Sequence, residues 1–459
     1  MRYALPSVEA GEIAVIGLGR SGVAAAELLN SRGYKLYACD DASTAGTAEA
    51  AARLEGQGIH TQTGGHDAER IAEASLVVLS PGVPPDAAPV IAATSAGREV
   101  ISEIEVALRC EPTLPYVAIT GTNGKTTTTA LVGHILRALG VREVDAGNIG
   151  TPLCEVVNSD LLPELVSLEL SSFQLHDTPS IGPRVGVLTN LSADHLDRYA
   201  SVDEYFADKA LLFRNADDSS RWIVNADDEA SQDLVRGVAG GWYEFSVARE
   251  ADGWYDRSAG ALMAFGHVLL HRSELNLLGD HNVANALAAT LAVMAVSDRY
   301  RSADAATAIA SALRSFRAMS NRLELVGEWN GVEWINDSKA TNVASTLVAV
   351  QGMTRPTVLL LGGRHKGEPY SALVDPARDH VKLVIAFGEA APIVQADLAN
   401  SVPLRRVDGS FEKVIAAARE AAEPGDAVLL SPACSSYDMF RNYVERGDRF
   451  RELAEKNNG

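Results

Sequence analysis

Residues 117–129 read VAITGTNGKTTTT, and their types and order suit the binding of a nucleotide phosphate. The apolar run at 117–119 predicts a short buried strand. Gly121 and Gly124 then allow a tight turn that brings the backbone close to a ligand. Two residues separate these glycines, whereas four residues separate them in the common phosphate loop. This short spacing restricts the number of protein families to which the loop can belong.

The residues after the second glycine supply charge and a hydroxyl group. Lys125 offers a positive charge to β- and γ-phosphate oxygens, and Thr126 offers a hydroxyl to Mg²⁺. A helix predicted over 127–138 would direct its positive amino end at the anion. The alternative without a binding role is a glycine turn that only connects the strand to the helix. The expected contacts to the nucleotide in this loop are Gly121, Thr122, Asn123, Gly124, Lys125, Thr126 and Thr127.

Five further charged or titratable residues have both a chemical and a structural interpretation. Glu169, in the apolar strand SLEL, is either a buried metal ligand or an edge-strand glutamate that faces water. His195 lies in a loop after a strand and is either a ligand or a solvated histidine. Lys209 lies within a helix, where a snorkelling lysine is the simpler interpretation. Asp337 and Lys339 are compatible with a surface ion pair.

A second glycine pattern lies near the amino terminus. Residues 17–22 read GLGRSG between a predicted strand and a predicted helix, and Asp40 ends the next strand. This arrangement is typical of a dinucleotide site. On these residues alone an NAD(P)-dependent oxidoreductase is one alternative, and a turn that binds nothing is another.

Composition and charge limit the class of protein. The chain has 459 residues, of which 47% are hydrophobic and 22% charged, as in a globular protein of about three domains. A net charge of −20 argues against nucleic-acid and membrane surfaces as partners. The four cysteines are scattered without zinc-site spacing, and we find no secretory leader and no apolar run long enough for a membrane span. We therefore expect a cytoplasmic protein, and we expect it to be a monomer.

Alternating strands and helices predict an α/β fold in three domains. The predicted boundaries are 1–109 for a Rossmann-like domain, 110–318 for a P-loop ATPase-like domain with a mostly parallel sheet, and 319–459 for a second Rossmann-like domain. Residues 242–272 are expected to form an antiparallel excursion. The predicted strands are 12–16, 34–39, 76–79, 165–170, 185–189, 222–224, 333–335, 357–361, 383–387 and 427–430, and the other predicted helices are 23–31, 204–213 and 284–296. Polar residues follow most strands, so they should gather at the carboxyl edges of the sheets.

The motifs together resemble the Mur ligase family over nearly the whole chain. The stretches that carry the resemblance are GTNGKTTT, LELSSFQL, LSADHLDRY with Lys209 downstream, and GDHNVANALAA. Three more, GNIG at 147–150, INDSKATN at 335–342 and SPACSSYDMFRNYVERGDRF at 431–450, point to the members that use glutamate. The resemblance implies an ATP-dependent ligase of peptidoglycan precursor synthesis that joins D-glutamate to UDP-MurNAc-L-Ala through an acyl phosphate.

The resemblance also implies roles for individual residues. The expected contacts to the UDP substrate are Arg20, Ser21, Asp40, Ser80, Pro81, Gly82, Asn148 and His195. Further contacts to ATP are expected from Asn282, Asn285, Arg322 and Asp337. The expected contacts to the amino acid are Lys339, Thr341, Lys366, Ser436, Tyr437 and Tyr443.

Two Mg²⁺ ions are implied by the same resemblance, with Thr126, Glu169, His195 and Lys209 around them. The matching lysine of the family carries a CO₂-derived carbamate, which converts a cation into an anionic oxygen ligand. Lys125, His195 and Lys209 are then the expected catalytic residues.

One stretch departs from the family pattern. Arg364 and His365 precede Lys366, where several members have an acidic or small residue. These basic residues either strengthen the binding of a dicarboxylate or change which amino acid is accepted. A ligase for L-glutamate or another amino acid therefore remains open. We also expect the third block to move towards the second during the reaction.

Overall fold

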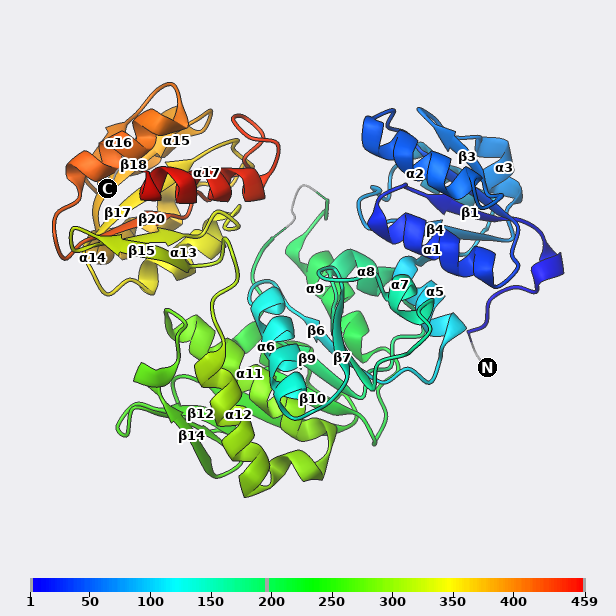
Figure 1. Ribbon diagram of the computed structural model, residues 1–459, viewed down its shortest axis with the longest axis horizontal. Coiled ribbons are helices and arrows are strands. Elements are labelled where there is room, and N and C mark those ends of the chain that lie inside the picture. Colours follow the sequence, from blue (N-terminus) through cyan, green and yellow to red (C-terminus); the bar gives the residue numbers. More distant parts are fainter. Residues whose placement is uncertain (1–2, 195–197, 457–459) are drawn as a thin grey trace. The chain divides into compact units, whose positions relative to one another are not determined.

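A computed structural model describes residues 3–194 and 198–456 (Figure 1). Within this part the strands form three sheets, of five, nine and six strands. The chain divides into two compact units: Met1–Leu269 with Asn285–Leu313, and Leu270–Ala284 with Arg314–Gly459. The predicted α/β class, with mostly parallel sheets, is confirmed.

The first sheet has the order β3-β2-β1-β4-β5, and its strands are parallel. Its strands are β1 (Ile13–Ile16), β2 (Leu36–Asp40), β3 (His60–Thr63), β4 (Leu76–Leu79) and β5 (Val100–Ser102). Helices α1 (Arg20–Ser31), α2 (Ala45–Glu55) and α5 (Glu103–Cys110) pack on one face, and α3 (Ala68–Glu73) and α4 (Ala88–Ser95) on the other. This doubly wound order places the loops after β1, β2 and β4 at one edge.

The second sheet has the order β14-β13-β12-β11-β10-β9-β6-β8-β7. Its first strands are β6 (Tyr116–Thr120), β7 (Glu143–Gly147), β8 (Leu165–Glu169), β9 (Val185–Leu188) and β10 (Arg221–Asn225). The others are β11 (Gly241–Ser246), β12 (Gly253–Asp256), β13 (Ala261–Ala264) and β14 (His267–His271). The helices of this part are α6 (Lys125–Ala138), α7 (Leu153–Val157), α8 (Ser172–His176), α9 (Val202–Ala210), α10 (Glu229–Leu234), α11 (Asp280–Val296) and α12 (Ala303–Ser315).

The expected antiparallel excursion at 242–272 is only partly correct. Strand β11 pairs parallel with both β10 and β12, and the antiparallel pairing begins between β12 and β13. Short turns bounded by Gly and Asp suggested a hairpin throughout, but α10 forms a crossover between β10 and β11 that makes this pair parallel.

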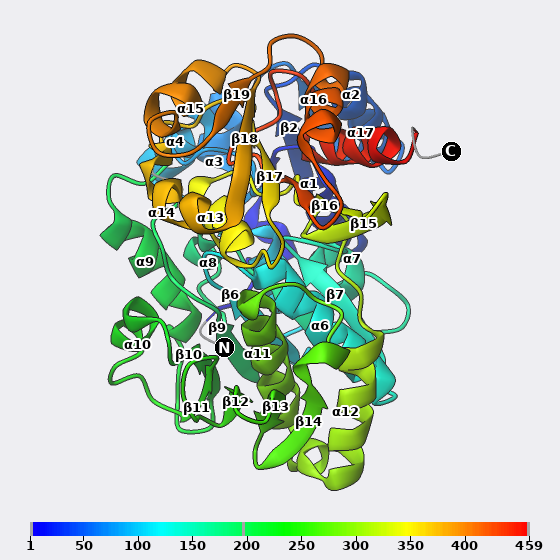
Figure 2. The same cartoon turned by 90° about the vertical axis from the view of Figure 1, so that its left-hand side faces the viewer.

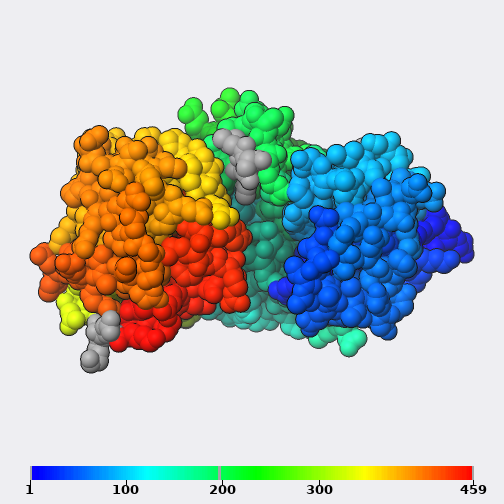
Figure 3. Space-filling model, turned by 90° about the horizontal axis from the view of Figure 1, so that it is seen from above, coloured from blue at the N-terminus to red at the C-terminus, as the bar shows by residue number. Residues whose placement is uncertain are grey.

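The third sheet has the order β15-β16-β20-β17-β18-β19, and β15 pairs antiparallel with β16 while the other pairs are parallel. Its strands are β15 (Glu324–Trp329), β16 (Val332–Asn336), β17 (Thr357–Gly362), β18 (Val381–Phe387), β19 (Leu404–Arg406) and β20 (Ala427–Leu430). Figure 2 shows α13 (Val343–Gln351), α14 (Val374–His380) and α15 (Ala391–Leu398) on one side of the sheet, and α16 (Phe411–Ala421) and α17 (Tyr443–Glu455) on the other. The surface of α17 is red in Figure 3.

Two helices start earlier than their apolar pattern predicts. Residues 23 and 284 are the predicted starts, whereas α1 begins at Arg20 and α11 at Asp280. Their first turns carry polar residues (Arg20, Ser21, Asp280, His281 and Asn282), so the apolar period begins one turn late. In 3–194 and 198–456 no helix combines the length and the apolar character that a membrane span requires.

Candidate functional site

The phosphate loop joins β6 to α6 and depends on both of its glycines. Gly121 has φ 140° and Gly124, the residue before α6, has φ 80°, both in the region that favours glycine. A Cβ atom on Gly121 would lie 2.0 Å from Thr189 Oγ1, and one on Gly124 would lie 2.3 Å from Asn285 Oδ1. The loop is therefore packed against the end of β9 and against α11, and Asn285 lies beside it.

Hydrogen bonds from the β9 loop hold the phosphate loop in shape. The Asn190 side chain accepts from Asn123 N at 3.0 Å and donates to Asn123 O at 3.0 Å. Thr122 Oγ1 donates to Ser192 O at 3.1 Å and accepts from Ser192 N at 3.0 Å. Contacts within the protein thus fix the loop shape, which lowers the ordering cost of binding.

Lys125 lies at the first turn of α6 and folds back over the loop. Its Nζ donates to Gly121 O at 2.8 Å and to Thr122 O at 2.7 Å. The ammonium group and the amino end of a 14-residue helix therefore act at the same place. Thr126, the next residue, is 5% exposed, and Thr127 is half-buried.

Glu169 is buried at the carboxyl end of β8, which lies between β6 and β7. The alternative of an edge-strand glutamate facing water is therefore wrong. Its Oε1 accepts from Asn148 Nδ2 at 2.8 Å, whereas its buried Oε2 has no hydrogen-bond partner in the structure. An orphaned carboxylate oxygen is costly inside a protein, and a bound cation would satisfy it.

Lys209 is 1% exposed, so the interpretation as a snorkelling lysine is also wrong. Its Nζ donates to Thr120 Oγ1 at 3.0 Å and lies 5.4 Å from the centre of the Tyr205 ring. Burial, helped by the positive charge of Lys125, lowers the pKa of Lys209 well below its ordinary value. This shift favours the neutral, nucleophilic form of the amine.

The residues around the phosphate loop supply hard oxygen ligands. Thr126 and Glu169 offer a hydroxyl and an orphaned carboxylate oxygen, a donor set that suits Mg²⁺. The predicted ligand and catalytic residue His195 lies outside the described residues. Among the residues that the structure does describe, no three His, Cys, Asp or Glu side chains cluster tightly enough to hold a metal by themselves.

The amino-terminal glycine loop is tightly packed. Gly17 has φ 96°, and a Cβ on Gly22 would lie 1.8 Å from Gly17 O, so α1 approaches the β1 turn at backbone distance. Asp40 accepts from Leu18 N at 2.7 Å and from Ala42 N at 2.8 Å. The loop at Ser80 completes this edge, since a Cβ on Gly17 would lie 2.7 Å from Ser80 Cβ.

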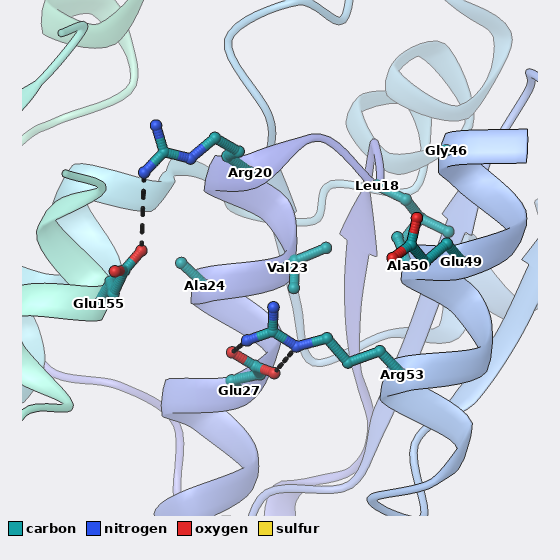
Figure 4. A pocket seen from close by; sticks show the side chains of 10 residues that line it. All are labelled: Leu18, Arg20, Val23, Ala24, Glu27, Gly46, Glu49, Ala50, Arg53 and Glu155. Atoms are coloured by element: carbon teal, nitrogen blue, oxygen red, sulfur yellow. Dashed lines mark hydrogen bonds and ion pairs between the residues drawn. The ribbon is translucent and has the colours of Figure 1, made fainter. Parts of the chain in front are cut away.

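A cavity of about 280 Å³ opens beside this loop (Figure 4). The exposed Arg20 side chain lies over it and contacts Gly150 O at 3.3 Å and Glu155 at 4.0 Å. Arg53 and Glu27 form an ion pair of 2.6 Å at the opposite wall. Arg20, which lines the cavity, thus also contacts the GNIG stretch through Gly150, and both parts are predicted to meet the UDP substrate. The lining residues are Leu18, Arg20, Val23, Ala24, Glu27, Gly46, Glu49, Ala50, Arg53 and Glu155.

Ser21, next to Arg20, is half-buried in the first turn of α1. Pro81 is half-buried and Gly82 is exposed, so both border the β4 end of this edge. The predicted UDP contacts therefore belong to neighbouring loops of the same unit, apart from His195.

In the second unit, Asp337 follows β16 and is 8% exposed. It accepts from Ser431 Oγ at 2.8 Å and from Leu323 N at 3.3 Å, so the surface ion pair with Lys339 is not formed. Burial raises the pKa of Asp337 to about 7. Asp337 and Arg322, predicted for ATP, and Asn282, which donates to Leu278 O at 2.8 Å, all belong to this unit.

The predicted amino-acid residues gather on loops at the carboxyl edge of the third sheet. Lys339 Nζ lies 3.9 Å from the centre of the Tyr443 ring, a cation–π contact. Ser436 is 2% exposed and Tyr437 is 63% exposed. Thr341 is half-buried, and Lys366 is exposed. Backbone hydrogen bonds of 2.9 and 3.1 Å between Arg364 and Ser435 tie the Lys366 loop to the Ser436 loop.

The two basic residues that depart from the family pattern have partners in the same unit. Arg364 forms an ion pair with Glu389 at 3.1 Å. His365 Nδ1 lies 3.0 Å from Tyr370 Oη, which lies 2.9 Å from Cys434 Sγ. Both side chains therefore stabilise the loop that carries Lys366.

Several site residues were not found by sequence reasoning. Thr120 and Asn190 lie at the ends of β6 and β9, and the rule that ligands gather beyond strand ends would have found them. Arg446 lies in α17, three residues after Tyr443, and is fully buried. No charge pattern in the sequence distinguishes it from the exposed arginines of that helix.

Comparisons with known proteins agree with this geometry. Three family models match: the MurD-like N-terminal domain of Mur ligases at residues 11–102, the Mur ligase middle domain at 119–293, and the Mur ligase glutamate ligase domain at 321–434. A UDP-N-acetylmuramoylalanine–D-glutamate ligase of Pelobacter propionicus is 40% identical over 96% of this chain and 97% of its own. A ligase of the same name from Salinibacter ruber is 41% identical over 96% of this chain and 97% of its own.

Solved structures support the fold. The UDP-N-acetylmuramate-alanine ligase of Thermotoga maritima has a TM-score of 0.60 at 20% identity, over 97% of this chain and 99% of its own. MurF of Acinetobacter baumannii has a TM-score of 0.59 at 15% identity, over 98% of this chain and 93% of its own. The phosphate loop, the buried Glu169 and Lys209, and relatives matched along almost the whole chain lead to one conclusion: this chain belongs to the Mur ligase family.

Proposed function

We propose that the protein joins D-glutamate to UDP-N-acetylmuramoyl-L-alanine with the hydrolysis of ATP to ADP and phosphate, in peptidoglycan precursor synthesis. The observation that carries this proposal is the likeness, at 36–41% identity over 96% or more of this chain, to ligases named for that reaction. The arrangement of the phosphate loop supports the use of ATP.

The reaction proceeds through an acyl phosphate. A carboxylate oxygen of the L-alanyl group attacks the γ-phosphorus of ATP, and the bond to the β-phosphate oxygen breaks, releasing ADP. The amine nitrogen of D-glutamate then attacks the acyl carbon, and the intermediate loses phosphate and a proton to leave an amide. Both steps need alignment of the reactants and neutralisation of phosphate charge more than covalent chemistry by the protein.

Residues of the first unit take the role of charge neutralisation. Lys125 and the amino end of α6 face the phosphates of ATP, with Asn285 beside the loop. Thr126 and Glu169 would hold Mg²⁺, which supplies further positive charge against the phosphate oxygens. His195 would act with them at a second ion, as the family resemblance implies. The other proposed ATP contacts are Gly121, Thr122, Asn123, Gly124 and Thr127 in the first unit, and Asn282, Arg322 and Asp337 in the second.

Lys209 is proposed to carry a carbamate. The neutral amine attacks CO₂, a nitrogen–carbon bond forms, and the amine loses a proton to solvent. Its burial and lowered pKa favour the neutral form that this step requires. The product is an anion, so it would also balance Lys125 and offer oxygen atoms to a metal.

The loops at the edge of the first sheet are proposed to hold the UDP substrate. Arg20 would contact the diphosphate, and Ser21, Asp40 and the loop Ser80–Pro81–Gly82 would border it, with Asn148 at the sugar-peptide end. The cavity beside Arg20 has room for part of such a ligand. The loops with Lys339, Thr341, Lys366, Ser436, Tyr437 and Tyr443 are proposed to hold glutamate.

We also keep the division at residues 1–109, 110–318 and 319–459 as a proposal for substrate, ATP and amino-acid domains. A monomer in the cytoplasm is proposed with it. The four cysteines are free thiols, which agrees with a reducing compartment.

An amino-acid panel tests the proposal. Purified protein with UDP-MurNAc-L-Ala, ATP and Mg²⁺ should release phosphate with D-glutamate and much less with L-glutamate, D-aspartate or no amino acid. Phosphate release equal to the amino-acid-free control in every case would overturn the ligase assignment. A preference for L-glutamate would keep the reaction type and change the substrate. Fluorescence of added NAD(P)H should be unaffected by the protein.

A further inference from the structure

Arg446 is a buried cation in an otherwise amphipathic surface helix. Helix α17 forms part of the molecular surface (red in Figure 3), and its arginines at 449 and 451 are partly exposed and paired with acids. Arg446 itself is 0% exposed. Removing a guanidinium from water costs several kcal/mol unless its donors are satisfied, so this position needs an explanation.

The guanidinium donates to two loops at once. Nε donates to Ser338 Oγ at 3.0 Å and Nη2 to Ser338 O at 2.9 Å. Nη2 also donates to Cys434 O at 3.1 Å, and Nη1 to Ser435 O at 3.4 Å. Ser338 Oγ in turn donates to Tyr443 O at 2.8 Å, in the first turn of α17. The loop after β16 and the loop after β20 are therefore joined through one side chain.

All four acceptors of Arg446 are neutral oxygens, so its charge is not cancelled by a paired carboxylate at hydrogen-bond distance. Burial lowers the pKa of Arg446 to about 10, which still leaves the group charged at neutral pH. A third loop is close as well, because a Cβ on Gly363 would lie 3.1 Å from Arg446 Nη1 and 2.3 Å from Ser435 O. The rigid fork of arginine fits this set of carbonyl groups in a way that a lysine cannot.

We propose that Arg446 is a positioning residue of the amino-acid site, which holds Ser338 and Cys434–Ser435 at a fixed separation. Lys339 follows Ser338 in the chain, and Ser436 follows Ser435. Both are proposed to contact glutamate, so the separation of Lys339 and Ser436 follows from the Arg446 bonds. This inference rests on the proposed function and names a further residue for it.

The test compares Arg446→Lys and Arg446→Met with Arg449→Met in the full-length protein. Arg449 lies on the same helix but points outwards to Glu412 and Glu452, so its variant controls for changes to α17. KM is measured separately for D-glutamate, ATP and UDP-MurNAc-L-Ala. Acyl-phosphate formation is measured without glutamate, by trapping the acyl group as a hydroxamate with hydroxylamine.

The expected result is selective. Arg446→Met should lower kcat/KM for D-glutamate about 100-fold, because small misplacements of binding groups cost about that much. The kcat/KM of Arg446→Lys for D-glutamate should lie between the values of Arg446→Met and the wild type. KM for both nucleotides and the hydroxamate rate should stay within about twofold of wild type, and Arg449→Met should resemble wild type throughout. If Arg446→Met does not fold, the Lys variant alone carries the same comparison.

Two results would overturn the inference. One is an unchanged kcat/KM for D-glutamate in a folded Arg446 variant. The other is an equal loss in all three substrates and in hydroxamate formation, which indicates a general structural role. Failure of the wild-type protein to use any amino acid would instead overturn the proposed function, so the two failures are distinguishable.

Discussion

Glu169 and Lys209 carry opposite potential charges in the same buried region, yet neither is satisfied by the other. Lys209 donates to the Thr120 hydroxyl, and among the described residues one oxygen of Glu169 has no hydrogen-bond partner. A protein evolved for stability alone would pair or remove such groups. Their arrangement makes sense if the amine is converted to an anion and the carboxylate receives a cation.

Replacement of Lys209 tests this conversion. Lys209→Ala should lower kcat by about 10²–10³-fold, as does loss of one preorganised charge in other active sites, and short-chain carboxylic acids should restore part of it. In wild-type protein supplied with ¹³C-bicarbonate, ¹³C NMR should show a carbamate signal that is absent from the variant.

The matched control is Lys413→Ala, which removes an exposed lysine from a helix of the second unit. It should keep both the signal and the rate. An unaffected rate in Lys209→Ala, or a carbamate signal that survives the substitution, would contradict the role given to Lys209.

At the scale of elements, the glycine loops and the buried strands are the predictable parts. Strands β4 and β20 are runs of four buried apolar residues, and their predicted limits match the structure because apolar runs mark strands covered on both faces. The edge strands β3, β7 and β19 were not found, since HTQT, EVDAG and LRR lack an apolar run. An edge strand pairs with only one other strand, and its position depends on that pairing. No local sequence pattern shows which strand the partner is.

The residues of the candidate site likewise divide into those that the sequence predicts and those that it does not. Some residues, such as Lys125 and Thr126, have a side-chain type that suits a ligand, and their spacing in a short motif is enough to predict them. Residues that act through burial, such as Arg446, depend on contacts between segments about one hundred residues apart in the chain, for example Ser338 with Arg446. Sequence spacing alone could not predict those contacts.

Glu103 joins two helices of the first unit and should make their stability depend on pH. It starts α5, and its Oε1 accepts from Cys154 N in α7, which follows the GNIG stretch. Its Oε2 is buried and has no hydrogen-bond partner within residues 3–194 and 198–456, and burial raises the pKa of Glu103 from 4.5 to about 7. Because the folded protein favours the protonated acid, this contribution to stability is complete below about pH 4.5, is lost as the pH rises to about 7, and changes no further above it.

Glu103→Gln remains neutral at every pH and keeps an oxygen for Cys154 N. Its Tm should therefore rise relative to wild type between about pH 4.5 and pH 7, by several degrees at most, since the full shift corresponds to at most about 3 kcal/mol. Differential scanning calorimetry at four pH values measures this, with the exposed Glu73→Gln as control. A Tm difference that is flat with pH, or that shrinks as the pH rises, would refute the assignment.

At the scale of the whole molecule, the residues proposed for one reaction are divided between two units. The phosphate loop, Glu169 and Lys209 belong to the first, and Lys339 and Ser436 belong to the second. The amine of glutamate must come within bonding distance of the acyl carbon for the second step. The reaction therefore requires the units to take a defined arrangement when the substrates are bound.

We predict that substrates shift the molecule towards a more compact arrangement. Small-angle X-ray scattering should show a smaller radius of gyration with a non-hydrolysable ATP analogue and UDP-MurNAc-L-Ala together than with neither, because each ligand favours the arrangement in which both units contact it. Lys125→Ala, which weakens phosphate binding, should need more of the analogue to reach the same change. Identical scattering with and without the ligands, at concentrations that saturate both sites by calorimetry, would show that closure does not accompany binding and that the units are already in their reactive arrangement.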